Sequence, residues 1–179
     1  MNKFRPVSLA SVAKLRSLVL VAALALSAAA CGGDDSGSGS GSGSGSCEIT
    51  VSKDMKKKPE ITIPDCATKP TELKIVDIVE GSGPEAKAGG AVAAQYVGKS
   101  WSTKEQFDAS WDHGGQPFTV APLGQAGVIQ GWNEGLVGMK QGGRRLLIIP
   151  PELGYGASGQ GPIGPNETLV FVVDAAQVG

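Results

Sequence analysis

The chain has one histidine, and it stands close to two carboxylates. Asp108, Asp112 and His113 fall within one short stretch, and a histidine paired with a carboxylate can act as a general base. However, Gly114 and Gly115 follow immediately, which is typical of a surface loop. No pattern brings the two carboxylates or a nucleophile together there. A solvated loop histidine is therefore the favoured interpretation, and hydrolytic chemistry is not indicated.

A second pattern, G-x-G-x-x-G over residues 154–159, matches the glycine spacing of dinucleotide sites. Such a site needs a helix whose N-terminus binds the phosphates. The following residues, 160–165, read Q-G-P-I-G-P, and no helix can begin there. We therefore predict no cofactor. A metal site is not predicted either, because one histidine and three cysteines offer too few ligands.

The most informative stretch is 128–139, V-I-Q-G-W-N-E-G-L-V-G-M. It predicts a loop that leads into one short helix, with Gly131 as a permissive entry residue. Helical spacing places Trp132 and Leu136 on one face. The polar side chains of this segment are then expected to point outward: Asn133, Glu134 and Lys140.

Residues 1–30 have the features of a bacterial signal peptide. A basic leader precedes the apolar run 18–26, and small residues at 27–30 precede Cys31. The apolar run is too short to span a bilayer as a mature helix. Cys31 and its surroundings resemble the lipobox of bacterial lipoproteins, which implies an exported protein anchored by lipid to the extracytoplasmic face of the cell membrane. An ordinary secretory signal is the alternative.

Residues 31–46 are interpreted as the lipidated cysteine and a tether. A Ser-Gly alternation over 36–46 predicts a random coil with a reach of about 20 Å. Removing the leader takes four of the 16 basic residues and none of the 17 acidic ones, so the mature chain has 12 against 17 and a formal charge of about -5. This charge disfavours nucleic acid as a partner.

Residues 47–72 are predicted to form a β-hairpin extension. The segments 48–51 (E-I-T-V) and 60–63 (E-I-T-I) alternate polar and apolar residues across a lysine-rich connection, with Cys47 and Cys66 at the open end. An exported protein can keep a disulfide, which would stabilise this loop by about 3 kcal/mol. We predict that the two cysteines are bridged. Free thiols or metal ligands are the alternatives.

From Leu73 onward the chain reads as a series of strands, expected over 73–79, 91–101, 117–121, 144–149 and 168–178. The alternation is less clean over 144–149, and 168–178 is an apolar strand of the kind found in the middle of a sheet. Consecutive strands with a single helical segment indicate an α+β domain, in which an antiparallel sheet packs on that helix. Trp132 would then lie where sheet and helix meet.

The domain resembles the FKBP-type peptidyl-prolyl cis-trans isomerases. Eight groups of residues carry the resemblance in order: 96–98 (Y-V-G), 107–110 (F-D-A-S), 117–118 (P-F), 128–136 (V-I-Q-G-W-N-E-G-L), Met139, 142–145 (G-G-R-R), 149–156 (I-P-P-E-L-G-Y-G) and 168–171 (T-L-V-F). The resemblance implies an isomerase domain over 73–179. Its fold would be a five- to six-stranded antiparallel half-barrel sheet wrapped around one short helix.

The resemblance also implies a pocket for proline between sheet and helix. Trp132 would form its floor, and its apolar wall would comprise Tyr96, Phe107, Phe118, Val128, Ile129 and Phe171. The Tyr155 hydroxyl would lie near the substrate carbonyl, and Asp108 would be the polar group on the rim. The Ile129 backbone N–H would bind the substrate chain. Ile163 matches an apolar residue of the flap before the last strand, and Gln160 stands where a histidine is often found.

The partners implied are proline-containing polypeptides and macrolide immunosuppressant-type ligands, with the protein acting as a monomer. Isomerisation moves no proton, which agrees with a site poor in titratable groups. A non-catalytic chaperone, or a module that binds proline-containing segments on the same fold, is the alternative.

Overall fold

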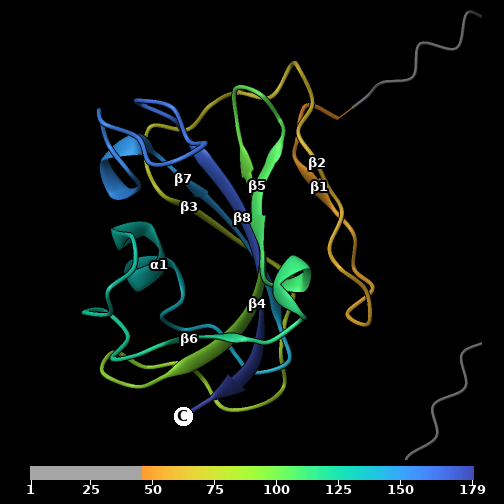
Figure 1. Cartoon of the computed structure of the whole chain (residues 1–179). Coiled ribbons are helices and arrows are strands. Elements are labelled where there is room, and N and C mark those ends of the chain that lie inside the picture. The colour runs from red at the N-terminus through yellow and green to blue at the C-terminus, as the bar shows by residue number, and fades with distance from the viewer. Residues whose placement is uncertain (1–45) are drawn as a thin grey trace, which may run out of the picture. The chain divides into compact units, whose positions relative to one another are not determined.

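The computed structural model describes residues 46–179 (Figure 1). The predicted signal peptide, Cys31 and nearly all of the tether lie outside the described residues. Among residues 46–179, no helix is long and apolar enough to cross a membrane.

The main body is an antiparallel six-stranded sheet that curves around the helix α1 (Gln130–Gly135) (Figure 1). The strand order is β3-β7-β8-β4-β5, and β6 pairs with β4 beyond the end of β5. This architecture confirms the predicted α+β fold. The strands are β3 (Lys74–Val79), β4 (Val92–Ser100), β5 (Gln106–Ala109), β6 (Phe118–Val120), β7 (Arg144–Ile149) and β8 (Leu169–Val178).

Three elements of this body were absent from the strand and helix prediction. One is β5, which pairs with β4 across a register shift between Gly98 and Lys99. The others are two short 3-10 helices, η1 (Ser110–His113) and η2 (Pro151–Leu153). His113 therefore ends a helical turn instead of lying in an irregular loop.

The helix α1 packs closely on β7 because glycines face the strand. A Cβ at Gly135 would lie 2.8 Å from Leu147 Cδ2, and a Cβ at Gly131 would overlap the Ile149 side chain. Glycine at both positions, four residues apart, thus lets backbone approach side chain directly. Trp132 and Leu136 are buried, as predicted. Asn133 is also buried, so the prediction that it points outward is wrong.

The sheet buries side chains on both faces. Leu147 and Ile149 belong to the core beneath α1, whereas Leu146 and Ile148 belong to a second core. That second core lies under the N-terminal hairpin, which contributes Ile61 and Ile63. Figure 1 shows α1 and the hairpin on opposite sides of the sheet. The last four residues of β7, L-L-I-I, form an apolar run typical of a strand covered on both faces.

The hairpin consists of β1 (Thr50–Val51) and β2 (Ile61–Thr62), paired antiparallel. Cys47 and Cys66 form a disulfide with a Cα–Cα distance of 5.2 Å, so the predicted bridge is confirmed. The strands are shorter than predicted because only two residue pairs are in register. The flanking Ile49 and Ile63 instead pack against the sheet.

One buried arginine fastens the hairpin to the sheet. Arg144 is fully buried, and its guanidinium binds the Asp174 carboxylate through Nε at 2.6 Å and Nη2 at 2.7 Å. The same group donates to three hairpin carbonyls, those of Ser52 (2.6 Å), Asp54 (3.3 Å) and Lys57 (3.1 Å). The connection between β1 and β2 thus closes over Arg144.

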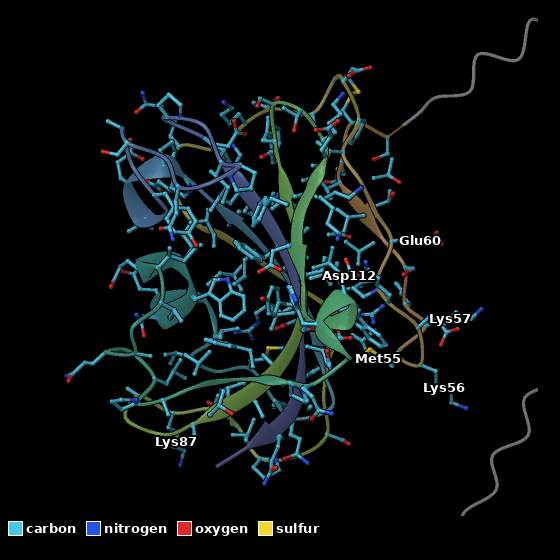
Figure 2. The ribbon with its side chains drawn as sticks, viewed as in Figure 1. Met55, Lys56, Lys57, Glu60, Lys87 and Asp112 are labelled. Atoms are coloured by element: carbon cyan, nitrogen blue, oxygen red, sulfur yellow. A yellow bond between two sulfur atoms is a disulfide. The ribbon has the colours of Figure 1, made fainter. Side chains whose placement is uncertain are left out.

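The hairpin also contacts η1. Lys58 Nζ lies 2.7 Å from Asp112 Oδ1, and Gln106 Nε2 donates to the other Asp112 oxygen at 2.7 Å. Figure 2 labels Asp112 at η1 and Met55 on the connection of the hairpin, with Lys56 and Lys57 pointing outward at its turn.

Candidate active site

A cavity of about 420 Å³ opens between the concave face of the sheet, α1 and the segment after η2. All ten residues predicted for the proline pocket line it: Tyr96, Phe107, Asp108, Phe118, Val128, Ile129, Trp132, Tyr155, Ile163 and Phe171. They come from four strands, one helix and two loops. The fold thus brings together side chains that are up to 75 positions apart in the sequence, Tyr96 to Phe171.

The floor of the cavity is a cluster of aromatic rings arranged edge to face. The Trp132 ring lies 5.2 Å from Tyr96, 5.3 Å from Phe171 and 6.3 Å from Phe118 between centroids, with interplanar angles of 82°, 83° and 78°. Edge-to-face pairs at these distances are mutually attractive. Each ring thus helps to fix the orientation of Trp132 in the floor.

Gly98 of β4 makes room for the wall. A Cβ at this position would lie 2.6 Å from Phe107 Cζ and 2.7 Å from Phe171 Cε1. The two rings lie 5.4 Å apart at 81°, directly over this glycine. Any side chain at position 98 would force one or both rings to shift.

Asp108 is held at the rim by three hydrogen bonds. Tyr96 Oη donates to Oδ2 at 2.7 Å, while the Ala109 N–H and His113 Nε2 both lie 2.8 Å from Oδ1. Burial raises the Asp108 pKa, but the hydrogen bonds from Tyr96, His113 and Ala109 outweigh it, so the net shift of the pKa is downward. Asp108 is therefore a carboxylate at neutral pH.

His113 remains mostly solvated, with 69% of its side chain exposed. The structure adds to the prediction a contact with Asp108, which the sequence did not indicate. The contact arises because η1 turns the chain back toward β5. His113 does not line the cavity.

The two tyrosines of the site differ in what their hydroxyl groups bind. Tyr96 is committed to Asp108, and burial together with this bond raises its pKa strongly. Tyr155 forms no hydrogen bond with another described residue, while burial and then the Asp108 charge raise the pKa of its phenol. Tyr155 thus keeps its proton at neutral pH and can donate it in a hydrogen bond to a bound carbonyl.

A second free donor comes from the backbone. Within residues 46–179, the Ile129 N–H, at the N-terminus of α1, makes no hydrogen bond. The cavity therefore offers an apolar floor and two donors, Tyr155 Oη and Ile129 N–H. Its one carboxylate, that of Asp108, already forms hydrogen bonds with three neighbouring residues.

Four further residues line the cavity and were not predicted as site residues: Gly127, Gln160, Gly161 and Pro162. The last three form the turn of the flap, in which Gln160 and Ile163 exchange two backbone hydrogen bonds of 2.9 Å. Gly161 takes a positive φ of 56° in this turn. The sequence 160–165 signalled a turn, but turn chemistry alone does not show which cavity a turn covers.

A sequence model of the FKBP-type peptidyl-prolyl cis-trans isomerases matches residues 83–175. The chain belongs to this family. The FKBP-type match begins after β3, so the hairpin and the first strand of the sheet lie outside it.

Individual FKBP proteins agree with the family match. An FK506-binding protein of Streptomyces anulatus is 50% identical over 124 residues, which cover 68% of this chain and 98% of that protein. A probable FK506-binding protein of Corynebacterium glutamicum is 48% identical over 118 residues, or 66% and 96% of the two chains. The crystal structure of AtFKBP13 superposes with a TM-score of 0.56 at 36% identity, covering 62% of this chain and 96% of that one. This FKBP is thus a peptidyl-prolyl cis-trans isomerase, as the sequence predicted.

Proposed function

We propose that this FKBP is exported, anchored by lipid at Cys31, and assists the folding of proline-containing polypeptides outside the cytoplasm. Residues 1–30 act as the signal peptide, 31–46 as the lipidated cysteine and tether, 47–72 as the hairpin extension and 73–179 as the isomerase domain. The protein works as a monomer on the extracytoplasmic face of the cell membrane.

Labelling with a radioactive fatty acid tests the anchor: we expect label on the wild type and none on Cys31→Ser.

The mechanism that we propose uses the environment of the imide and no proton transfer. Rotation about a peptide bond costs roughly 18 to 20 kcal/mol because resonance is lost, and uncatalysed X-Pro exchange takes tens to hundreds of seconds. The planar imide carries more charge on its oxygen than the twisted one. An apolar pocket therefore destabilises the planar form relative to the twisted form.

The observation that carries this proposal is the composition of the cavity. Trp132, Phe107 and Phe171 supply an apolar surface for the proline ring. The Tyr155 hydroxyl and the Ile129 N–H make no hydrogen bond with any residue of the described part of the chain and can hold the flanking carbonyls. Lowering the barrier by about 5 kcal/mol would accelerate exchange roughly a thousandfold to ten-thousandfold.

The same cavity supports a proposal about ligands. Relatives that are about half identical are named FK506-binding proteins, and a macrolide of that type would occupy the apolar floor.

Exchange spectroscopy on an X-Pro peptide tests catalysis directly. We expect acceleration by the wild type that the macrolide abolishes. Peptide binding without acceleration would instead identify a non-catalytic binding module.

Tyr155→Phe tests the free hydroxyl. We expect the variant to lower kcat/KM by about three- to tenfold, the value of one neutral hydrogen bond. The folded state should be unaffected, because this hydroxyl makes no hydrogen bond within residues 46–179. Turnover equal to that of the wild type would show that the hydroxyl does not act on the substrate.

A further inference from the structure

Asn133 is a buried amide in the middle of α1, with 4% of its surface exposed. Its side chain forms four hydrogen bonds with the loop that precedes the helix. Oδ1 accepts from the Gly124 N–H and the Ala126 N–H, both at 3.0 Å. Nδ2 donates to the Ala126 carbonyl at 3.1 Å and to the Val128 carbonyl at 3.4 Å. The amide thus uses both of its donor hydrogens and both acceptor sites on one loop.

This loop forms part of the cavity but has little structure of its own. Its internal hydrogen bonds are two short turns, from the Gln125 N–H to the Pro122 carbonyl at 3.0 Å and from the Val128 N–H to the Ala126 carbonyl at 2.8 Å. Gly127, Val128 and Ile129 nevertheless line the cavity wall. Asn133 is therefore the side chain that ties residues 124–128 to the helix carrying Trp132.

The bond to the Val128 carbonyl, at 3.4 Å the longest of the four, bears on the direction of the free donor. The Val128 carbonyl and the Ile129 N–H belong to one planar peptide unit, and in a trans peptide they point in opposite directions. Asn133 holds the carbonyl toward α1. The N–H at the other end of the same unit is thereby turned away from the helix interior, and it has no protein partner among the described residues.

We propose that Asn133 is a positioning residue for isomerisation, which orients the Ile129 N–H toward the substrate chain. The inference rests on the proposed role of that N–H in binding. Asn133 touches no substrate itself and acts through the Val128–Ile129 peptide. The residue type matters because an amide can accept from the loop and donate to it at once, whereas a carboxylate can only accept.

Asn133→Asp separates the hydrogen bonds that the side chain accepts from those that it donates. The introduced carboxylate keeps acceptors for the Gly124 and Ala126 N–H groups but, when ionised, donates nothing to the Ala126 and Val128 carbonyls. We expect KM to rise about three- to tenfold with kcat nearly unchanged, because an interaction made in both the ground state and the transition state is lost. A merely structural role would lower the active fraction, and thus apparent kcat, without raising KM.

The orientation of the donor can be measured without any catalysis. In ¹⁵N relaxation of the folded protein, the Ile129 N–H of the wild type should have an order parameter near 0.85, and that of Asn133→Asp should fall toward 0.6 or below. The matched control is Glu134→Gln, the exposed neighbour on the same helix, whose side chain meets Gln130. This control should equal the wild type in KM and in the Ile129 order parameter.

An unchanged KM and a rigid Ile129 N–H in Asn133→Asp would overturn the proposal, even if the wild type proves an efficient isomerase. A mobile Ile129 N–H in the wild type would overturn it as well, which keeps the test decisive should the variant fail to fold. An inactive wild type with the expected order parameters would refute the proposed function and the role of Asn133 in catalysis, and would support only the orientation of the Ile129 N–H by Asn133.

Discussion

Arg144→Met is expected to lower the free energy of unfolding by about 3 to 5 kcal/mol, the cost of leaving one partner of a buried ion pair without the other. The Asp174 carboxylate would remain buried in β8, and three hairpin carbonyls would lose their donor. Urea denaturation followed by tryptophan fluorescence measures this change.

The double variant Arg144→Met with Asp174→Leu separates the two causes. It removes the orphaned carboxylate, so part of the lost stability should return, and the remainder reports the hydrogen bonds to the hairpin. Both variants, where folded, should keep isomerase activity because Arg144 lies on the face of the sheet away from the cavity. If Arg144→Met lowered the free energy of unfolding by less than about 1 kcal/mol, the Arg144–Asp174 pair would behave as a solvent-exposed ion pair and not as a buried one.

Phe107→Ala is expected to lower kcat/KM by roughly ten- to hundredfold. Burying a phenylalanine side chain contributes about 1.5 to 3 kcal/mol, and each 1.4 kcal/mol of transition-state stabilisation is a factor of ten in rate. The ring lies on the cavity wall against Phe171, so its removal leaves the twisted imide partly in water. Exchange spectroscopy on an X-Pro peptide measures the effect.

Ile75→Ala is the control for this variant. Ile75 is a large apolar side chain of β3 that is 44% exposed and lies outside the cavity. Its removal should leave kcat/KM within a factor of two. Equal losses in the two variants would mean that the rate reports general stability and not the wall of the pocket.

Nine of the ten predicted pocket residues could be named from the sequence because they stand in an ordered set of family motifs, and Ile163 was named from its match to the flap. The sequence could not show which contacts hold these side chains in place. The prediction for Asn133 failed because a helical wheel describes only the helix, whereas residues 124–128 fold back over the face that the wheel assigned to solvent. The most connected polar side chain near the cavity was therefore taken for a surface residue.

Two other features depended on tertiary contacts. β5 is four residues long and carries polar as well as apolar side chains, so its strand conformation follows from pairing with β4 and not from its own pattern. The contact between His113 and Asp108 arises from the turn of η1. Neither feature has a local signal strong enough to be found in a single sequence.

The irregular alternation in β7 indicates that both faces of this strand are buried, and the prediction did not draw this conclusion. A strand with one buried face alternates, whereas R-R-L-L-I-I fills both faces. Its second apolar face is covered by the hairpin, through Ile61 and Ile63. The extension outside the family match is therefore part of the structure that supports the isomerase sheet.

We propose that the pocket promotes rotation by its apolar surroundings and without proton transfer. Asp108 is held ionised and both site tyrosines are held neutral around neutral pH, because the pKa of the carboxyl is lowered and those of the phenols are raised. The most direct test is the catalysed exchange rate of an X-Pro peptide between pH 6 and 8. We predict a nearly constant rate across this interval; a steep bell-shaped profile would instead show that an acid and a base take part in the reaction.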